Sequence, residues 1–277
     1  MSWRLRIRHT TGYRYDTEVA SSYNEARLAP QTELSQLTIE SSVMTSPGAT
    51  QQRYWDYWGT QVTAFDVHEP HAELEVTATS LVDTSDPREP EPVTWSELDA
   101  ARDLHAELLV PSARTVPDAE LVELAAQARS RQSPYEVVLA LSETVRDRVA
   151  YQPGSTGVRT SALQAWELGQ GVCQDIAHVT LAMLRAAGVP ARYVSGYLHP
   201  QPDAVLGEVV VGESHAWVEA WLGGWWPFDP TNDLPVGLRH VTVARGRDYG
   251  DVPPLKGVYA GGGSQSLGVR VEVTRLA

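Results

Sequence analysis

The chain has 277 residues, of which 42% are hydrophobic and 21% charged, as in an ordinary globular protein of one or two domains. Nine tryptophans and eleven tyrosines exclude disorder for the bulk of the chain. A net charge of −13 argues against a phosphate-binding surface, so we expect no nucleic-acid partner. No apolar run approaches the roughly 20 residues of a membrane span. The first ten residues also lack the apolar segment of a signal peptide, so we expect a cytoplasmic protein with no membrane partner.

The first third of the chain alternates between apolar and polar side chains. Trp3, Leu5 and Ile7 would face one way, and the arginines between them the other way, which is the period of a half-buried strand. Similar short runs follow at 37–39, 62–65 and 74–79. We therefore predict that residues 1–82 form a small antiparallel β-domain, as a sandwich.

A linker and a helical region follow the β-domain. Residues 83–92 contain three prolines and four acidic residues and cannot bury a face, so 83–93 is the predicted linker. From there to 277 we predict a catalytic core that begins with a capping box at Thr94. Its predicted elements are helices over 95–108, from 117, from 134 and over 162–168, and strands over 192–198, 214–221, 225–229, 258–259 and 267–275. We expect the last strand to complete the core sheet, or alternatively to pair with the N-terminal domain.

The single cysteine begins a well-formed helix. Residues 173–187 carry an apolar stripe, and Gly188-Val-Pro190 supplies a stop signal. A helix N-terminus stabilises a thiolate, and its free N–H groups also stabilise an oxyanion. Cys173 is therefore a candidate nucleophile, although a free cysteine is often only a small buried hydrophobic residue.

A histidine and an aspartate follow at a spacing that brings them together. His215 opens a predicted strand, and Asp229 ends the next one, 14 residues later. If these strands pair, an odd-numbered loop or a bulge near 222–224 is required to place both side chains on one face. A two-residue turn would put them on opposite faces. With both on one face, His215 would withdraw the thiol proton, and Asp229 would accept the other imidazole N–H.

Three separated motifs resemble the transglutaminase-like superfamily of papain-like Cys–His–Asp enzymes. They are GVCQDIAH at 171–178, SHAWV at 214–218 and WPFDPTN at 226–232. The chain is most similar to a bacterial branch with an added N-terminal β-domain, through 8–15, 24–30, 56–60 and 246–252. Thr60 departs from the asparagine usual in that branch, which concerns a turn in the β-domain and not the triad. The similarity runs nearly end to end, and three motifs in one chain order are far more specific than one short pattern.

The resemblance implies a fold and a set of roles. The fold would be α+β, with an N-terminal antiparallel β-domain followed by a papain-like core. Cys173 would be the nucleophile, His215 the general base and acid, and Asp229 the orienting carboxylate. Further candidates are oxyanion donors and residues near the substrate, namely Gln170, Gln174, Trp166, Tyr151 and Trp217. We interpret His178 as a packing residue and Asp175 as a complement to the helix dipole.

The predicted function is a thiol enzyme that acts on a peptide or protein substrate, with no cofactor and no metal. The same acylation serves hydrolysis, as in a cysteine peptidase or amidase, and transfer to an amine, as in a transglutaminase. We favour hydrolysis because water is always present and nothing in the sequence indicates a second cleft that would bind an amine. Three weaker alternatives are an arylamine-acetyltransferase-like enzyme, a non-catalytic peptide-binding scaffold, and a metal site. The metal would require Cys173, His215 and Asp229 to serve as its ligands as well as the triad. Neither the natural substrate nor the oligomeric state follows from the sequence.

Overall fold

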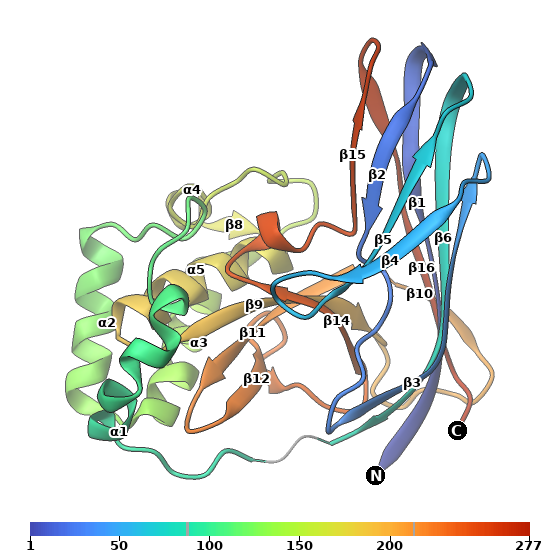
Figure 1. Ribbon diagram of the computed structural model, residues 1–277. Coiled ribbons are helices and arrows are strands. Elements are labelled where there is room, and N and C mark those ends of the chain that lie inside the picture. The colour runs from blue at the N-terminus through green and yellow to red at the C-terminus, as the bar shows by residue number, and fades with distance from the viewer. Residues whose placement is uncertain (87–88, 213) are drawn as a thin grey trace.

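The computed structural model describes residues 1–86, 89–212 and 214–277. Long strands form one side of the molecule, and helices packed on a separate sheet of shorter strands form the other (Figure 1). The predicted α+β class is confirmed. Residues 87 and 88, in the middle of the predicted linker, lie outside the described residues. Within the described residues no helix is long and apolar enough to cross a membrane.

The β-side of the molecule is built from two antiparallel sheets. Its strands are β1 (Ser2–Val19), β2 (Ser22–Ala26), β3 (Gln36–Ser46), β4 (Gln51–Trp55), β5 (Gln61–Val67), β6 (His71–Ser85), β10 (Val209–Gly212), β15 (Leu255–Tyr259) and β16 (Ser264–Arg275). The first sheet has the order β10-β16-β1-β6-β3, and the second has the order β15-β2-β5-β4. The predicted alternation in β1 is present, with Leu5 and Ile7 buried and the arginines between them exposed. Burial of each such side chain contributes about 1.5–3 kcal/mol.

Both ends of the chain contribute to the β-side. The expectation that the last strand completes the core sheet is wrong, because β16 pairs with β1 along most of its length. Val273 lies opposite Ile7, and Val271 lies opposite His9, so this pairing buries the apolar face of β16 beside that of β1. β6 also runs to Ser85, into the start of the predicted linker. Figure 1 shows the two termini close together, and the backbone N–H of Arg4 donates to Ala277.

The helices of this region begin at, or within two residues of, their predicted starts. They are α1 (Trp95–Ala100), the 3-10 helix η1 (Arg102–Leu108), α2 (Ala119–Arg131), α3 (Pro134–Arg148), α4 (Ala162–Leu168) and α5 (Cys173–Ala186). Capping boxes at Thr94 and Ser133 start α1 and α3. The single helix predicted to reach Leu108 instead ends at Ala100, and a 3-10 helix follows it. Within that 3-10 helix His105 takes a non-helical conformation, with its ring against those of Trp221 and Trp225.

A second five-stranded sheet carries the candidate site. Its order is β13-β12-β11-β9-β14. The strands are β9 (Ala191–Leu198), β11 (Ser214–Trp221), β12 (Trp225–Asp229), β13 (Leu234–Pro235) and β14 (His240–Gly246). Helix α5 packs on β9 and β11, and α2, α3 and α4 surround it, so nearly every side chain from Gln174 to Arg185 is buried. Two short parallel strands, β7 (Ala150–Tyr151) and β8 (Gln170–Gly171), lie just before the helix.

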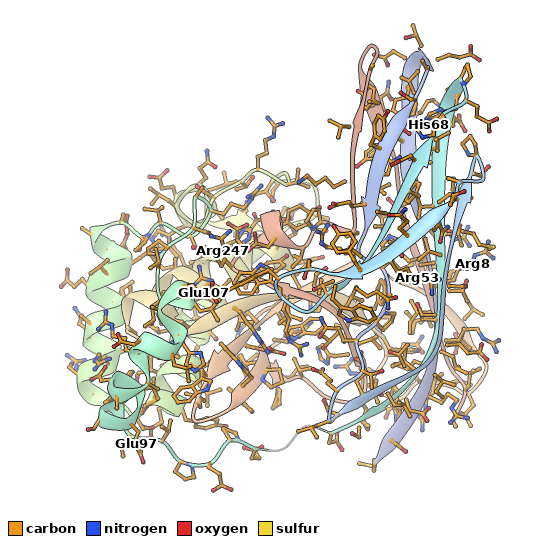
Figure 2. All side chains as sticks on the ribbon, in the orientation of Figure 1. Arg8, Arg53, His68, Glu97, Glu107 and Arg247 are labelled. Carbon is orange, nitrogen blue, oxygen red and sulfur yellow. The ribbon has the colours of Figure 1, made fainter. Side chains whose placement is uncertain are left out.

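The two sides of the molecule are joined by a buried charge network. The guanidinium of Arg245 on β14 makes paired hydrogen bonds to Glu219 on β11, at 2.8 to 3.1 Å, and also contacts Glu33 from the β-side. Glu219 further accepts from Arg192. A second contact joins the tip of the β4–β5 hairpin to η1, where Tyr57 donates to Glu107. Figure 2 labels Glu107 on the helical side of the molecule.

Candidate active site

Cys173 is the first residue of α5 and is partly buried. The residues around it fix the start of the helix. Asp175 accepts hydrogen bonds from the Val172 backbone N–H at 2.9 Å and from the Thr156 hydroxyl at 2.5 Å. Burial raises the pKa of the Asp175 carboxyl, although both hydrogen bonds oppose the shift. Asp175 therefore serves the first turn of the helix, as its position suggested.

His215 and Asp229 lie on one face of the β11–β12 pair. Trp221 pairs with Trp225, which leaves a three-residue loop, the odd number that this arrangement requires. The pairing of Val218 with Phe228 places Asp229 one residue further along, diagonal to His215. Nε2 of His215 donates to Oδ2 of Asp229 at 2.7 Å. A bulge is not needed.

The side chain of Cys173 lies close enough to the His215 imidazole to raise its pKa, through hydrogen bonding and charge. Because Nε2 is used on Asp229, Nδ1 is the ring nitrogen left for the sulfur. Burial lowers the pKa of His215, but the hydrogen bonds to Asp229 and Cys173 and their charges outweigh burial and raise it to about 10. The same hydrogen bond, together with one from His240, holds the pKa of Asp229 far below its usual range against the effect of burial.

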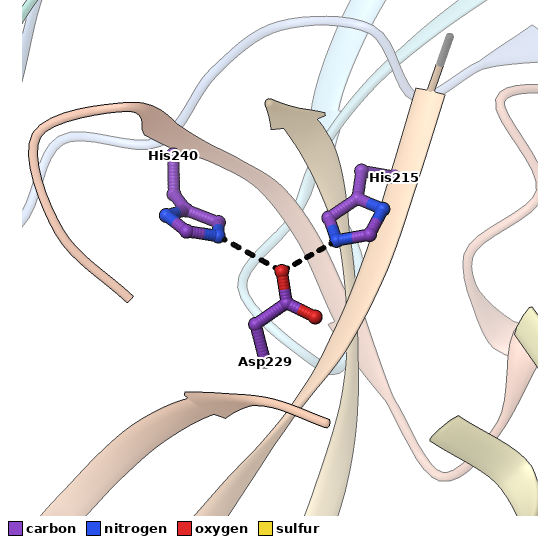
Figure 3. A group of neighbouring side chains, drawn as sticks. All are labelled: His215, Asp229 and His240. Carbon is purple, nitrogen blue, oxygen red and sulfur yellow. Dashed lines mark hydrogen bonds and ion pairs between the residues drawn. The ribbon is translucent and has the colours of Figure 1, made fainter. Parts of the chain in front are cut away.

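Two further residues, which the sequence did not single out as site residues, bind Asp229. Nδ2 of Asn232 donates to Oδ2 at 2.8 Å, and Nε2 of His240 approaches the same oxygen at 3.2 Å (Figure 3). Oδ1 accepts the backbone N–H groups of Thr231 and Asn232. Asn232 belonged to a motif used for the family resemblance, and that was its only signal. His240 had none, because β14 was not predicted as a strand.

Two of the further candidates for an oxyanion or substrate-lining role, Trp166 and Trp217, make other contacts in the structure. The Trp166 indole N–H donates to Glu120 at 3.0 Å, so its expected role as an oxyanion donor is wrong. Trp217 is fully buried and packs against His215 and His240 from within the sheet, so it does not line a substrate surface.

Three candidates remain near the nucleophile. Tyr151 is 48% exposed, and its partner in the β7–β8 pairing is Gly171, two residues before Cys173. Gln170 is exposed on β8, and Gln174 follows the nucleophile directly with 9% exposure. His178 is fully buried and accepts the Tyr249 backbone N–H, as expected of a packing residue.

Metal-ligand atoms also converge at this site. His215, Asp229 and His240 each offer an atom within 4.8 Å of the others. However, the two imidazole Nε2 atoms that a metal would use are the atoms that donate to Asp229. A metal ion would have to displace both hydrogen bonds, and Cys173 is not a member of this group. We therefore assign the group to hydrogen bonding.

The chain is similar to known proteins over most of its length. Residues 122–230 match the transglutaminase-like superfamily, and residues 5–83 match the bacterial transglutaminase-like N-terminal region. Uncharacterized protein ML0607 of Mycobacterium leprae is 47% identical, over 99% of this chain and 100% of that protein. The protein-glutamine gamma-glutamyltransferase of Pseudomonas aeruginosa is 35% identical over 162 residues, which are 53% of this chain and 23% of that enzyme.

A solved structure has the same overall fold. The crystal structure of a candidate cysteine protease from Cytophaga hutchinsonii aligns with a TM-score of 0.81 and 26% identity, covering 100% of this chain and 92% of that one. The chain described here belongs to the transglutaminase-like superfamily.

Proposed function

We propose that this chain is a cysteine enzyme that cleaves peptide or amide bonds through an acyl-enzyme intermediate on Cys173. The observation that carries the proposal is the placement of the His215 imidazole, which is hydrogen-bonded to the buried carboxylate of Asp229 and lies close enough to Cys173 for the thiol to act on its pKa. An imidazole held in this way takes a proton from one side while the carboxylate stabilises the resulting charge.

Each step of the proposed reaction has a residue to perform it. Nδ1 of His215 takes the thiol proton, and the sulfur of Cys173 attacks the carbonyl carbon. The first-turn N–H groups of α5, with Gln174 as a further candidate donor, stabilise the oxyanion. The imidazolium returns the proton to the leaving amine as the C–N bond breaks. Water, deprotonated by His215, then releases the acid and restores the thiol.

Water and an amine are both chemically suitable acceptors for the acyl group. We favour water because it is always present and no described feature marks a second cleft for an amine. The match to a protease candidate over the whole fold supports this choice. The match to a protein-glutamine gamma-glutamyltransferase supports transfer as the second candidate. Both reactions take a peptide or protein as acyl donor.

The two reactions separate in one experiment. β-Casein is incubated with the enzyme and dansylcadaverine, and mass spectrometry records new peptide termini, deamidated glutamine and dansylated glutamine. The proposal predicts new termini or deamidation as the main product, and no product with Cys173→Ser, which is nearly isosteric. Dansylated glutamine as the main product would establish transfer instead. Product formation that is unchanged in Cys173→Ser would overturn the cysteine mechanism.

A further inference from the structure

Asp229 lies between two histidines, and the proposed mechanism uses only one of them. His215 on β11 and His240 on β14 approach the same oxygen, Oδ2, from opposite sides, at 2.7 and 3.2 Å (Figure 3). These strands are not neighbours, because β9 lies between them in the sheet. The second histidine is therefore brought to the site by the packing of three strands.

The hydrogen bonds of His240 fix which nitrogen carries its proton. The backbone N–H of Gly237 donates to Nδ1 at 3.2 Å, so Nδ1 acts as an acceptor. The proton of a neutral ring must then be on Nε2, where it is donated to Asp229. The His240 side chain is only 1% exposed, and its ring meets the Trp217 ring edge-on at 5.3 Å. The two hydrogen bonds and this ring contact together fix the direction of the His240 ring.

Burial keeps His240 neutral at pH 7. Asp229, His215 and Arg239 act on it electrostatically, and Glu219 lines the same small cavity. Burial lowers its pKa, and the attraction of Asp229 does not compensate. A neutral donor restrains Asp229 without bringing a second positive charge to face the His215 imidazolium.

We propose that His240 is a positioning residue for the reaction, whose Nε2–H holds Oδ2 of Asp229 in line with His215. This inference rests on the proposed function. With Oδ1 held by the backbone N–H groups of Thr231 and Asn232, the bond from His240 prevents the carboxylate from turning aside each time the imidazole gains or loses a proton. A variant at His240 would lose activity because Asp229 is less restrained, and not because a contact with the substrate is lost.

Two substitutions separate hydrogen bonding from packing. His240→Gln keeps an N–H donor near the place of Nε2, whereas His240→Phe keeps a ring against Trp217 but has no donor. We expect kcat to fall about tenfold in His240→Phe and less than about threefold in His240→Gln, with KM unchanged in both. A tenfold loss of kcat corresponds to the free energy of about one hydrogen bond. A role in packing alone would give the reverse order, with His240→Phe the more active variant, and that order would overturn the proposal.

A spectroscopic measurement decides the point without any substrate. Long-range ¹H–¹⁵N spectra of the full-length wild-type chain at pH 7 should show His240 as the neutral Nε2–H tautomer, with assignment from the loss of its signals in His240→Gln. An Nδ1–H tautomer or an imidazolium would contradict the proposal, even in a variant series where His240→Phe fails to fold. If β-casein is left unmodified by the wild-type protein, the proposed function fails, while the spectra still give the state of His240.

Discussion

Nε2 of His215 lies 2.7 Å from Oδ2 of Asp229, although the two residues stand on different strands. A loop of three residues, 222–224, sets this relationship, because it gives the hairpin the parity that puts both side chains on one face. The strands that carry them lie in the sheet on which α5 packs, and Cys173 begins that helix. The geometry of the hairpin thus makes possible the hydrogen bond to Asp229 that raises the pKa of His215.

Loss of the carboxylate should damage the reaction without abolishing it. In Asp229→Ala, kcat should fall by about 10²- to 10⁴-fold, because the imidazole loses its fixed orientation while Cys173 remains. The donors left unpaired should also lower the free energy of unfolding by about 1–3 kcal/mol. Asp233→Asn is the matched control, since this carboxylate is half-exposed and pairs with Arg146. Full activity of Asp229→Ala at both saturating and dilute substrate would contradict the triad.

The activity should persist to alkaline pH. The leaving amine is protonated by the His215 imidazolium, and the raised pKa means that His215 keeps this proton until the pH rises through about 10. A profile of kcat/KM from pH 5 to 11 should therefore fall on its alkaline side near pH 10. In Asp229→Asn the charge that raises the pKa of His215 is lost, so the alkaline fall should move to lower pH. An alkaline fall at the same pH in both proteins would contradict this coupling.

Gly196 should tolerate no side chain, because it lies under the site. It pairs with His215, and a Cβ atom there would come within 2.1 Å of the Val241 carbonyl oxygen and 2.5 Å of the Trp217 ring. We expect Gly196→Ala to lower the free energy of unfolding by at least about 1–3 kcal/mol, measured by urea denaturation, and to lower kcat as Trp217 shifts. Gly224→Ala is the control, since no atom lies within 4 Å of the added carbon. Equal stability of the two variants would refute this prediction.

The charge network between the two sides of the molecule should be sensitive to the loss of one partner. Arg245→Met leaves Glu219 with less compensation in a buried position, and breaking such a pair costs about 3–5 kcal/mol. Arg4 makes a similar paired contact with Asp83, but at the surface, so Arg4→Met should leave the unfolding midpoint nearly unchanged. Thermal unfolding of the two variants, side by side, tests this contrast. Comparable losses would mean that burial of the network does not set its strength.

Local signals in the sequence predicted much of the fold. Caps at Thr94 and Ser133, the stripe of α5 and the alternation in β1 all depend on neighbours within a few residues. The parity of the hairpin loop is also local, which is why the meeting of His215 and Asp229 could be anticipated.

What the sequence did not reveal depends on pairing between distant segments. The partner of the Trp166 indole is Glu120, 46 residues away, and no periodicity points to it. His240 reaches Asp229 only because β14 pairs with β9. The local pattern of β16 suits either sheet, and its position is determined by the pairing with β1, which buries the apolar faces of both strands together. The pairing of distant strands is determined by which apolar faces become buried together, and this cannot be read from local patterns in a single sequence.

The most direct test of the Cys173–His215 pair is the rate of alkylation by iodoacetamide at pH 7. Cys173 is the single cysteine of the chain, so the incorporated label reports on this thiol alone. An imidazole that takes the thiol proton should make wild type react at least about tenfold faster than His215→Ala, with equal rates once both proteins are unfolded in urea. Equal rates in the folded proteins would contradict the pairing, and with it the assignment of Cys173 as the nucleophile.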